Sequence, residues 1–138
     1  MKTFVIGMAV GFAALSAQAE FVVIVNPKNA AASMSAEQVS QLFLGRSTSF
    51  PGGAAATPVD QKEGSALRDE FYTKVADKNP GQVKAFWAKQ MFSGKGQPPK
   101  ELASSADVKK AVAAEAGAIG YIEKGALDGT VKSVLSLP

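Results

Sequence analysis

The passage from Val59 to Arg68 contains the residues whose types and spacing are best suited to binding a ligand. Gly64 and Ser65 stand where an extended segment gives way to a helix, and the first N–H groups of a helix have no partners within it. These N–H groups and the partial positive charge at the helix start suit a small anion. Gly64 would let a ligand approach the backbone closely, Ser65 adds a hydroxyl, and Arg68 lies in the first turn. The passage predicts an anion site; the simpler interpretation is an ordinary capped helix with Arg68 in solvent.

The residue types that are missing exclude much of catalytic and metal chemistry. The chain of 138 residues contains no histidine and no cysteine. Without histidine there is no Ser-His-Asp triad and no imidazole base, and without cysteine there is no thiol nucleophile or thiolate metal site. Carboxylates and lysines remain, so a carboxylate-based enzyme is the least favoured functional hypothesis. We expect a protein that is not an enzyme and that requires no cofactor.

Two further clusters have structural explanations that we prefer over functional ones. The segment 117–121 (GAIGY) could form a hinge or a ligand face, but a core strand with close contacts at its glycines explains it as well. The second cluster combines lysines with aromatic residues, as in a nucleic-acid surface: Lys95, Lys100, Lys109, Lys110, Phe86, Trp87 and Phe92. A formal net charge of only +3 favours a solvated charged face with the aromatic rings in the core. We therefore expect no nucleic-acid partner.

Residues 1–19 have the organisation of a secretory signal peptide. Lys2 supplies a positive start, an apolar stretch runs from Thr3 to Leu15, and residues 17–19 (AQA) form a small-x-small cleavage pattern. The apolar stretch is shorter than the roughly 20 residues that a membrane-spanning helix needs. The sequence predicts that residues 1–19 are cleaved. Residues 20–138 would then form a single domain in the periplasm or outside the cell, with no stable membrane insertion.

The remaining chain alternates strand and helix patterns. Apolar runs rich in β-branched residues predict strands over residues 20–25, 57–60, 117–122 and 130–135. The first of these is a continuous apolar run, typical of a buried strand in a parallel sheet. Capping residues predict helices that begin at Ser35, at Gly64-Ser65, at Asn79-Pro80 and at Ser104 or Ser105. The order predicts an α/β fold, a small sandwich whose mixed, mostly parallel sheet is flanked by helices.

Two details of this assignment concern the third helix and the chain that follows it. Apolar side chains repeat at helical spacing and predict one buried face: Val83, Phe86, Trp87 and Met91. Residues 93–100 (SGKGQPPK) are rich in turn-forming residues and predict a loop.

Five motifs, taken in order, carry a resemblance to a known family: FVVIVN at 21–26, MSAEQVSQLFLG at 34–45, Pro58-Val59 leading to Gly64-Ser65, Phe86-Trp87, and GAIGY at 117–121. Together they resemble the phosphate-binding proteins of ABC uptake systems, in the type 2 periplasmic binding protein superfamily. A full member of that family has two lobes with phosphate between them. The resemblance implies that this chain corresponds to one lobe.

The resemblance also implies a ligand and the residues that would hold it. The ligand would be a small oxyanion, phosphate in this family, and the binding residues would be Gly64, Ser65, Ala66, Arg68 and Gln61. The family's ligand loop resembles R-S-D-G-S-G-T. Here Gln61 stands at the arginine position and Ala66-Leu67 replaces the glycine-threonine pair, so Arg68 is the candidate replacement cation.

Two functional hypotheses follow, and they differ in what the chain recognises. The first is a periplasmic solute-binding-like protein that recognises an oxyanion, is linked to ABC uptake through a permease, and could rebuild a cleft as a homodimer. The alternative is an envelope interaction or signalling module that keeps the lobe fold but has lost high-affinity ligand capture. The replaced positions of the ligand loop motivate this alternative.

Overall fold

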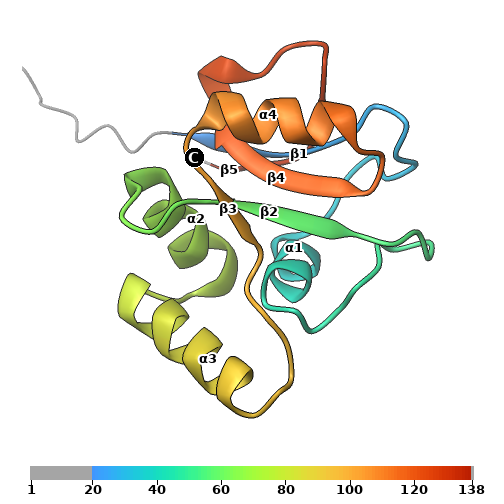
Figure 1. Ribbon diagram of the computed structural model, residues 1–138. Coiled ribbons are helices and arrows are strands. Elements are labelled where there is room, and N and C mark those ends of the chain that lie inside the picture. The colour runs from blue at the N-terminus through green and yellow to red at the C-terminus, as the bar shows by residue number, and fades with distance from the viewer. Residues whose placement is uncertain (1–19, 138) are drawn as a thin grey trace, which may run out of the picture.

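The structure, a computed structural model, describes residues 20–137; the predicted signal peptide lies outside the described residues. The elements in chain order are β1 (Phe21–Val25), α1 (Ala36–Phe43), β2 (Thr57–Gln61), α2 (Ala66–Ala76), α3 (Pro80–Phe92), β3 (Lys100–Leu102), α4 (Ser105–Ala114), β4 (Ala118–Glu123), the 3-10 turn η1 (Lys124–Ala126) and β5 (Lys132–Leu137). Figure 1 shows how the helices lie around the sheet. No helix within residues 20–137 has the length and apolar character that crossing a membrane requires.

The strands form one mixed sheet in the order β3-β2-β4-β1-β5. β2 runs parallel to both β3 and β4, whereas β1 runs antiparallel to both β4 and β5. The α/β sandwich with a mixed sheet is confirmed, but the pairings are evenly divided rather than mostly parallel. The reason is the place of β1, which is the N-terminal strand and lies between two C-terminal strands that both run opposite to it.

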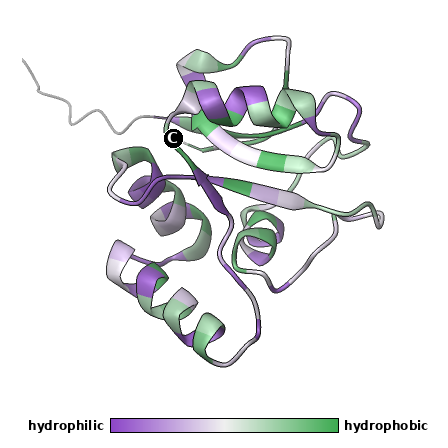
Figure 2. Ribbon diagram, in the orientation of Figure 1, coloured by the Kyte–Doolittle hydropathy of each residue, from purple (hydrophilic) through white to green (hydrophobic). Residues whose placement is uncertain are grey.

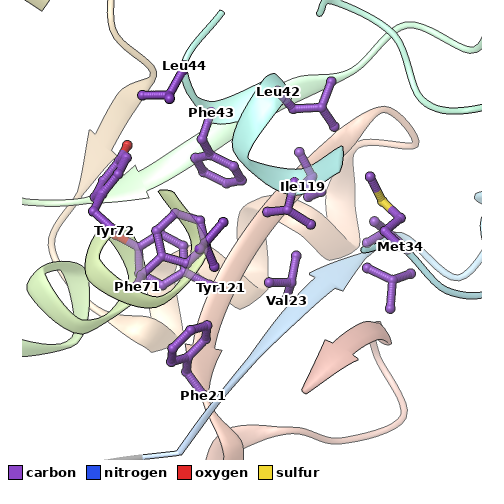
Figure 3. Close-up of a cluster of buried hydrophobic side chains, with 14 of the residues drawn as sticks. Phe21, Val23, Met34, Leu42, Phe43, Leu44, Phe71, Tyr72, Ile119 and Tyr121 are labelled. Atoms are coloured by element: carbon purple, nitrogen blue, oxygen red, sulfur yellow. The ribbon is translucent and has the colours of Figure 1, made fainter. Parts of the chain in front are cut away.

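The sheet is covered on both faces, so every residue of β1 is buried. Phe21, Val23 and Val25 face a cluster that includes side chains of α1 and α2, whereas Val22 and Ile24 face α4. This alternation is the period of two that a strand imposes. Figure 3 shows the larger cluster, in which aromatic rings from β1, α1, α2 and β4 meet. The buried strand predicted at this position is confirmed, although its partners are antiparallel.

The predicted helix starts are confirmed by side-chain caps. The N-cap residues are Ser35, Ser65, Asn79 and Ser104, and each accepts a hydrogen bond from the backbone N–H three residues on. Such bonds satisfy N–H groups that the helix itself leaves free. Sequence patterns therefore predicted the starts of the four α-helices within residues 20–137 correctly.

The predicted close contacts at the glycines before and within β4 are confirmed. A Cβ atom on Gly120 would lie 2.5 Å from Cγ1 of Val108 on α4, and one on Gly117 would lie 2.8 Å from the carbonyl oxygen of Ala55. Both distances are shorter than a carbon atom tolerates. The absence of a side chain at Gly120 lets α4 pack closely against the sheet.

The predicted loop is confirmed over residues 93–99, but a short strand that the sequence does not predict, β3, begins at Lys100. Its first two residues, Lys100 and Glu101, are exposed. The strand is hydrophilic (Figure 2). Pairing with β2, rather than a hydrophobic pattern, makes this segment extended. In α3, Val83 and Trp87 are buried as predicted, but Met91 is 51% exposed. Phe92, which the preferred interpretation assigned to the core, is 91% exposed because α3 extends beyond the elements that cover its first half.

Candidate functional site

The strands β2 and β3 end at the same edge of the sheet, and a helix begins directly beyond each of them. α2 follows β2 after a short loop, and α4 follows β3. Because the two strands are parallel, the starts of both helices meet at their carboxyl ends, where ligands bind in many α/β proteins. The predicted anion site lies at this edge.

A buried carboxylate, that of Asp60, is the centre of the site. Its side chain is only 2% exposed. The hydroxyl of Tyr72 on α2 donates a hydrogen bond to it at 2.6 Å, the hydroxyl of Tyr121 on β4 donates a second, and the Gln61 N–H donates a third at 2.8 Å. The buried charge is thus surrounded by donors from three elements, as buried polar groups require.

Burial also shifts the proton affinities of this group and its partners. Loss of solvent raises the pKa of Asp60 above its ordinary value, although both tyrosine hydroxyls and the charge of Arg68 act in the opposite direction. Burial, reinforced by the charge of Asp60, raises the pKa of Tyr72 and the pKa of Tyr121 far above their ordinary value. Both phenols therefore stay protonated at neutral pH and serve as hydrogen-bond donors, not as bases.

Arg68 lies between two carboxylates on neighbouring strands. Asp60 and Glu101 are direct partners in the parallel register of β2 and β3. The guanidinium approaches Asp60 at 3.9 Å and donates a hydrogen bond to Glu101 at 3.1 Å. Two like charges at paired positions would repel each other, and Arg68 compensates both. Its side chain is 12% exposed, so the expectation of a solvated Arg68 is wrong.

The carboxylate of Glu101 also contacts the loop that precedes α2. It accepts a hydrogen bond from the Glu63 N–H at 3.1 Å while its other oxygen accepts from Arg68. The carboxylate of Glu101 is therefore an internal oxyanion that binds the Glu63 N–H and Arg68. Arg68 is the cation that the sequence analysis assigned to a ligand. The Glu101 side chain is 40% exposed, so it can leave this position without opening the core.

The structure places the other predicted site residues as follows. Ser65 is the N-cap of α2 and accepts from the Arg68 N–H at 3.2 Å. Within residues 20–137, the N–H groups of Ala66 and Leu67 have no hydrogen-bond partner. Gly64 has a φ of +95°, which glycine adopts readily, and open space where its side chain would be. Gly64, Ser65, Ala66 and Arg68 are thus neighbours at the start of α2.

Gln61 lies beside them but its side chain is already used. Its amide nitrogen donates to the Ser105 hydroxyl at 3.0 Å and to the Tyr121 carbonyl at 3.1 Å. Gln61 is only 5% exposed. It therefore ties β2 to α4 and β4, and it is not free to receive a ligand.

Sequence reasoning missed four residues of this site. These are Asp60, Tyr72, Tyr121 and Glu101. A signal existed for three of them, because an acidic residue within a buried strand and tyrosines at core positions both need polar partners. Glu101 could not have been found, since its role depends on the register of a strand that its sequence does not predict.

No group of three or more acidic side chains in residues 20–137 is arranged to hold a metal ion. Both tyrosines are protonated, and Asp60 is surrounded by protein donors with almost no solvent contact. What remains accessible is the loop before α2, together with the partly exposed carboxylate of Glu101.

Comparison with known proteins supports the fold. No family model and no curated protein sequence matches the chain. Among solved structures, a candidate phosphate ABC transporter substrate-binding protein from Clostridium perfringens, solved with bound phosphate, has 24% identity and a TM-score of 0.65 over 84% of this chain and 45% of that one. An ABC-type phosphate transport receptor from Vibrio cholerae has 18% identity and a TM-score of 0.65, over 84% of this chain and 46% of that one. PstS from Borrelia burgdorferi has 13% identity and a TM-score of 0.59, over 84% of this chain and 47% of that one.

The chain therefore spans less than half the length of the solved proteins that it resembles. The likeness extends over most of residues 20–137 and agrees with the family resemblance of the sequence motifs. The fold of this chain is that of about one half of a phosphate ABC transporter substrate-binding protein.

Proposed function

We propose that this protein is a non-catalytic binding protein that recognises a small oxyanion, phosphate in the first instance, at the loop before α2. The observation that carries the proposal is the position of the Glu101 carboxylate, which accepts hydrogen bonds from the Glu63 N–H and from Arg68. An anionic group is already stabilised there by donors of the kind that a phosphate uses. The free N–H groups of Ala66 and Leu67 supply further donors nearby.

Binding would require Glu101 to leave Arg68. Its side chain is partly exposed, so the exchange needs no rearrangement of the core. The internal carboxylate competes with the ligand, and this competition weakens phosphate binding by the native protein. Replacing Glu101 by glutamine removes the competing charge while nearly preserving the shape of the side chain.

A thermal-shift titration with phosphate, sulfate and chloride at matched ionic strength tests the proposal. A ligand present at about 100 times its Kd stabilises a protein by about 2.7 kcal/mol, which raises the Tm by several degrees. We expect Glu101→Gln to show a larger phosphate-specific shift than the native protein. Ser65→Ala should show a smaller one, each measured against the variant's own ligand-free Tm.

The matched control is Ser35→Ala, which removes the N-cap of α1 and leaves the loop before α2 unchanged. It should lower the ligand-free Tm as Ser65→Ala does but keep the native response to phosphate. If neither the native protein nor Glu101→Gln responds specifically to phosphate, the proposal is wrong. A Ser65→Ala protein that binds phosphate as well as the native one would remove this residue from the site.

We also propose that the protein is exported and acts in the periplasm, as the pattern of residues 1–19 predicts. Mass spectrometry of the protein recovered from a periplasmic fraction should find Glu20 as the first residue. An uncleaved chain in the cytosol would contradict this localisation. Delivery of the anion to an ABC permease is a further part of the proposal, supported by the solved proteins with the same fold, which include a phosphate ABC transporter substrate-binding protein and a phosphate transport receptor.

The second candidate function is an interaction module without ligand capture. One observation favours it: both cationic and amide side chains predicted to bind the anion, Arg68 and Gln61, already have protein partners. The titration separates the two functions, since an interaction module would not respond to phosphate even after Glu101→Gln.

A further inference from the structure

The C-terminal end of α3 carries two large hydrophobic side chains that face solvent. Phe92, the last residue of the helix, is 91% exposed, and Met91 is 51% exposed. Ala85 and Ala88 are exposed as well and lie on the same side of the helix as Phe92. Burying one aromatic side chain removes about 150–250 Å² of surface from contact with water. The exposure of Phe92 is therefore unfavourable unless another surface covers it.

The positive charge of the protein is concentrated in the segment that contains α3. Residues 78–100 contain five lysines and no acidic residue. The acids at the borders of this segment are Asp77 and Glu101, and Glu101 already binds Arg68. Because the five lysines exceed the formal net charge of +3 for the whole chain, the rest of the chain is net negative. An anionic surface would therefore attract this segment in preference to the rest of the protein.

Two of the lysines lie close to Phe92 along the chain. Lys89 precedes it by one helical turn on the same side of α3, and Lys95 follows in the next loop; both are exposed. Within residues 20–137 neither forms an ion pair, whereas Lys84 is paired with Glu63 at 3.8 Å. Lys89 and Lys95 are thus available to an external anionic group.

Two further cations lie against α3 from neighbouring loops. The guanidinium carbon of Arg46 is 5.7 Å from the ring centroid of Phe86, and the ammonium of Lys78 is 5.5 Å from the same centroid. No carboxylate of the described residues forms an ion pair with either cation. Cations from three segments of the chain therefore gather around this helix.

We propose that this face of α3 binds the surface of a lipid bilayer that contains anionic phospholipids. Phe92 and Met91 enter the boundary between headgroups and acyl chains, and Lys89 and Lys95 pair with the phosphate groups of the lipids. α3 has 13 residues and is about 20 Å long, so it can lie in the plane of the bilayer surface. The attachment is peripheral, because only one face of the helix leaves water.

The observations favour a bilayer over other anionic partners. Phe92 protrudes from the end of a helix, and a fluid bilayer accepts a protruding side chain without a matching groove. α3 lies at one end of the molecule, where a flat surface can reach it (Figure 1). A single-stranded nucleic acid would also meet the lysines, but it binds through rings that stack on its bases, and Met91 offers none.

The proposal does not rest on the binding of phosphate at the loop before α2. Vesicle binding is measured without free phosphate, so either proposal can fail while the other holds. The measurement uses the processed protein from the periplasmic fraction, because the apolar residues 3–15 would themselves bind lipid. If residues 1–19 are retained, the full chain is compared with its own variants, which all share that segment.

Co-sedimentation with vesicles of phosphatidylglycerol and phosphatidylcholine tests the proposal. We expect binding that weakens as the salt concentration rises and is at least about tenfold weaker to phosphatidylcholine alone. Phe92→Ala should weaken binding to the anionic vesicles by about tenfold or more, because the aromatic side chain no longer leaves water. Leu127→Ala truncates another exposed hydrophobic residue, on a different part of the chain, and should leave binding unchanged.

A pair of charge reversals tests the contribution of the lysines. Lys89→Glu combined with Lys95→Glu should weaken binding by at least about tenfold, since each lysine near an anionic surface contributes to binding. The matched control is Lys28→Glu combined with Lys110→Glu, which makes the same change in net charge at exposed lysines outside residues 78–100. The control should retain most of the native affinity.

Four results would overturn the proposal. They are no binding to anionic vesicles, equal binding to neutral ones, binding that Phe92→Ala leaves intact, and equal losses from the two pairs of charge reversals. A protein that binds a single-stranded oligonucleotide and no vesicles would assign this face of α3 to nucleic acid instead.

Discussion

At the scale of single residues, the most informative group is the buried carboxylate of Asp60. It accepts hydrogen bonds from two tyrosines and one backbone N–H, and it faces the guanidinium of Arg68 at 3.9 Å. Burial nevertheless raises its pKa above the ordinary value. The folded protein therefore binds a proton at Asp60 more tightly than the unfolded chain does.

This difference predicts a dependence of stability on pH. A group whose pKa is raised by folding contributes stability below its unfolded pKa, and that contribution is lost as the pH rises through the folded pKa. We expect the free energy of unfolding of the native protein, measured relative to Asp60→Asn, to fall as the pH rises from about 4 towards neutrality. Urea unfolding of both proteins at a series of pH values measures the difference.

The comparison with Asp60→Asn removes the contribution of carboxylates that the two proteins share, including Asp128, whose pKa its bonds to Lys109 and Thr130 hold well below the ordinary range. A difference that stays constant with pH would show that Asp60 has the same pKa in both states. A difference that grows with pH would mean that folding lowers the pKa of Asp60. The hydrogen-bond donors and Arg68 would then affect this pKa more than burial does.

At the scale of elements, the contact between α4 and the sheet depends on one glycine. Gly120 lies on β4, and its missing side chain leaves room for Val108 on α4 and Val59 on β2. α4 buries only Val108 and Val112, so a small displacement affects its whole apolar face. Close packing of this kind tolerates an added methyl group poorly.

We expect Gly120→Ala to destabilise the protein by about 2 kcal/mol, because the new Cβ would overlap Val108 and the helix would have to move outward. Gly125→Ala is the control, since a Cβ there meets nothing within 4 Å, and its effect should stay within about 0.5 kcal/mol. Thermal or urea unfolding gives both values. Equal effects of the two substitutions would mean that α4 shifts freely on the sheet.

At the scale of the whole molecule, the described residues combine a well-packed sheet with one helix, α3, that lies at the periphery. β4 is paired with β1 on one side and β2 on the other, and all but its last residue are buried. α3 buries only Val83 and Trp87, and it lies at the end of the molecule farthest from β1 and β5 (Figure 1). Stability within a domain is rarely uniform, and elements with few buried side chains open first.

Hydrogen exchange at low protein concentration should therefore give the strongest protection to the backbone N–H groups of β4 and much weaker protection to those of α3. Protection of α3 equal to that of β4 in the dilute protein would contradict this division of the molecule.

The sequence by itself determined the class of the fold, the four helix starts and the exclusion of histidine and cysteine chemistry. The exclusion depends on composition, whereas the fold class and the helix starts depend on local patterns: capping residues such as Ser35 and Asn79, the apolar run of β1, and the glycines of the GAIGY segment. Each signal is contained within a few residues of the chain. The resemblance to phosphate-binding proteins rests on the same short motifs.

Tertiary structure alone decided what the candidate site contains. Glu101 became a partner of Arg68 because β3 pairs with β2 in a register that places it beside Asp60. Tyr72 and Tyr121 met the same carboxylate from a helix and a strand that are distant in sequence. Phe92 became exposed because nothing in the described chain covers the end of α3. Charge compensation and exposure depend on which segments meet in space, and a pattern along the chain does not contain that information.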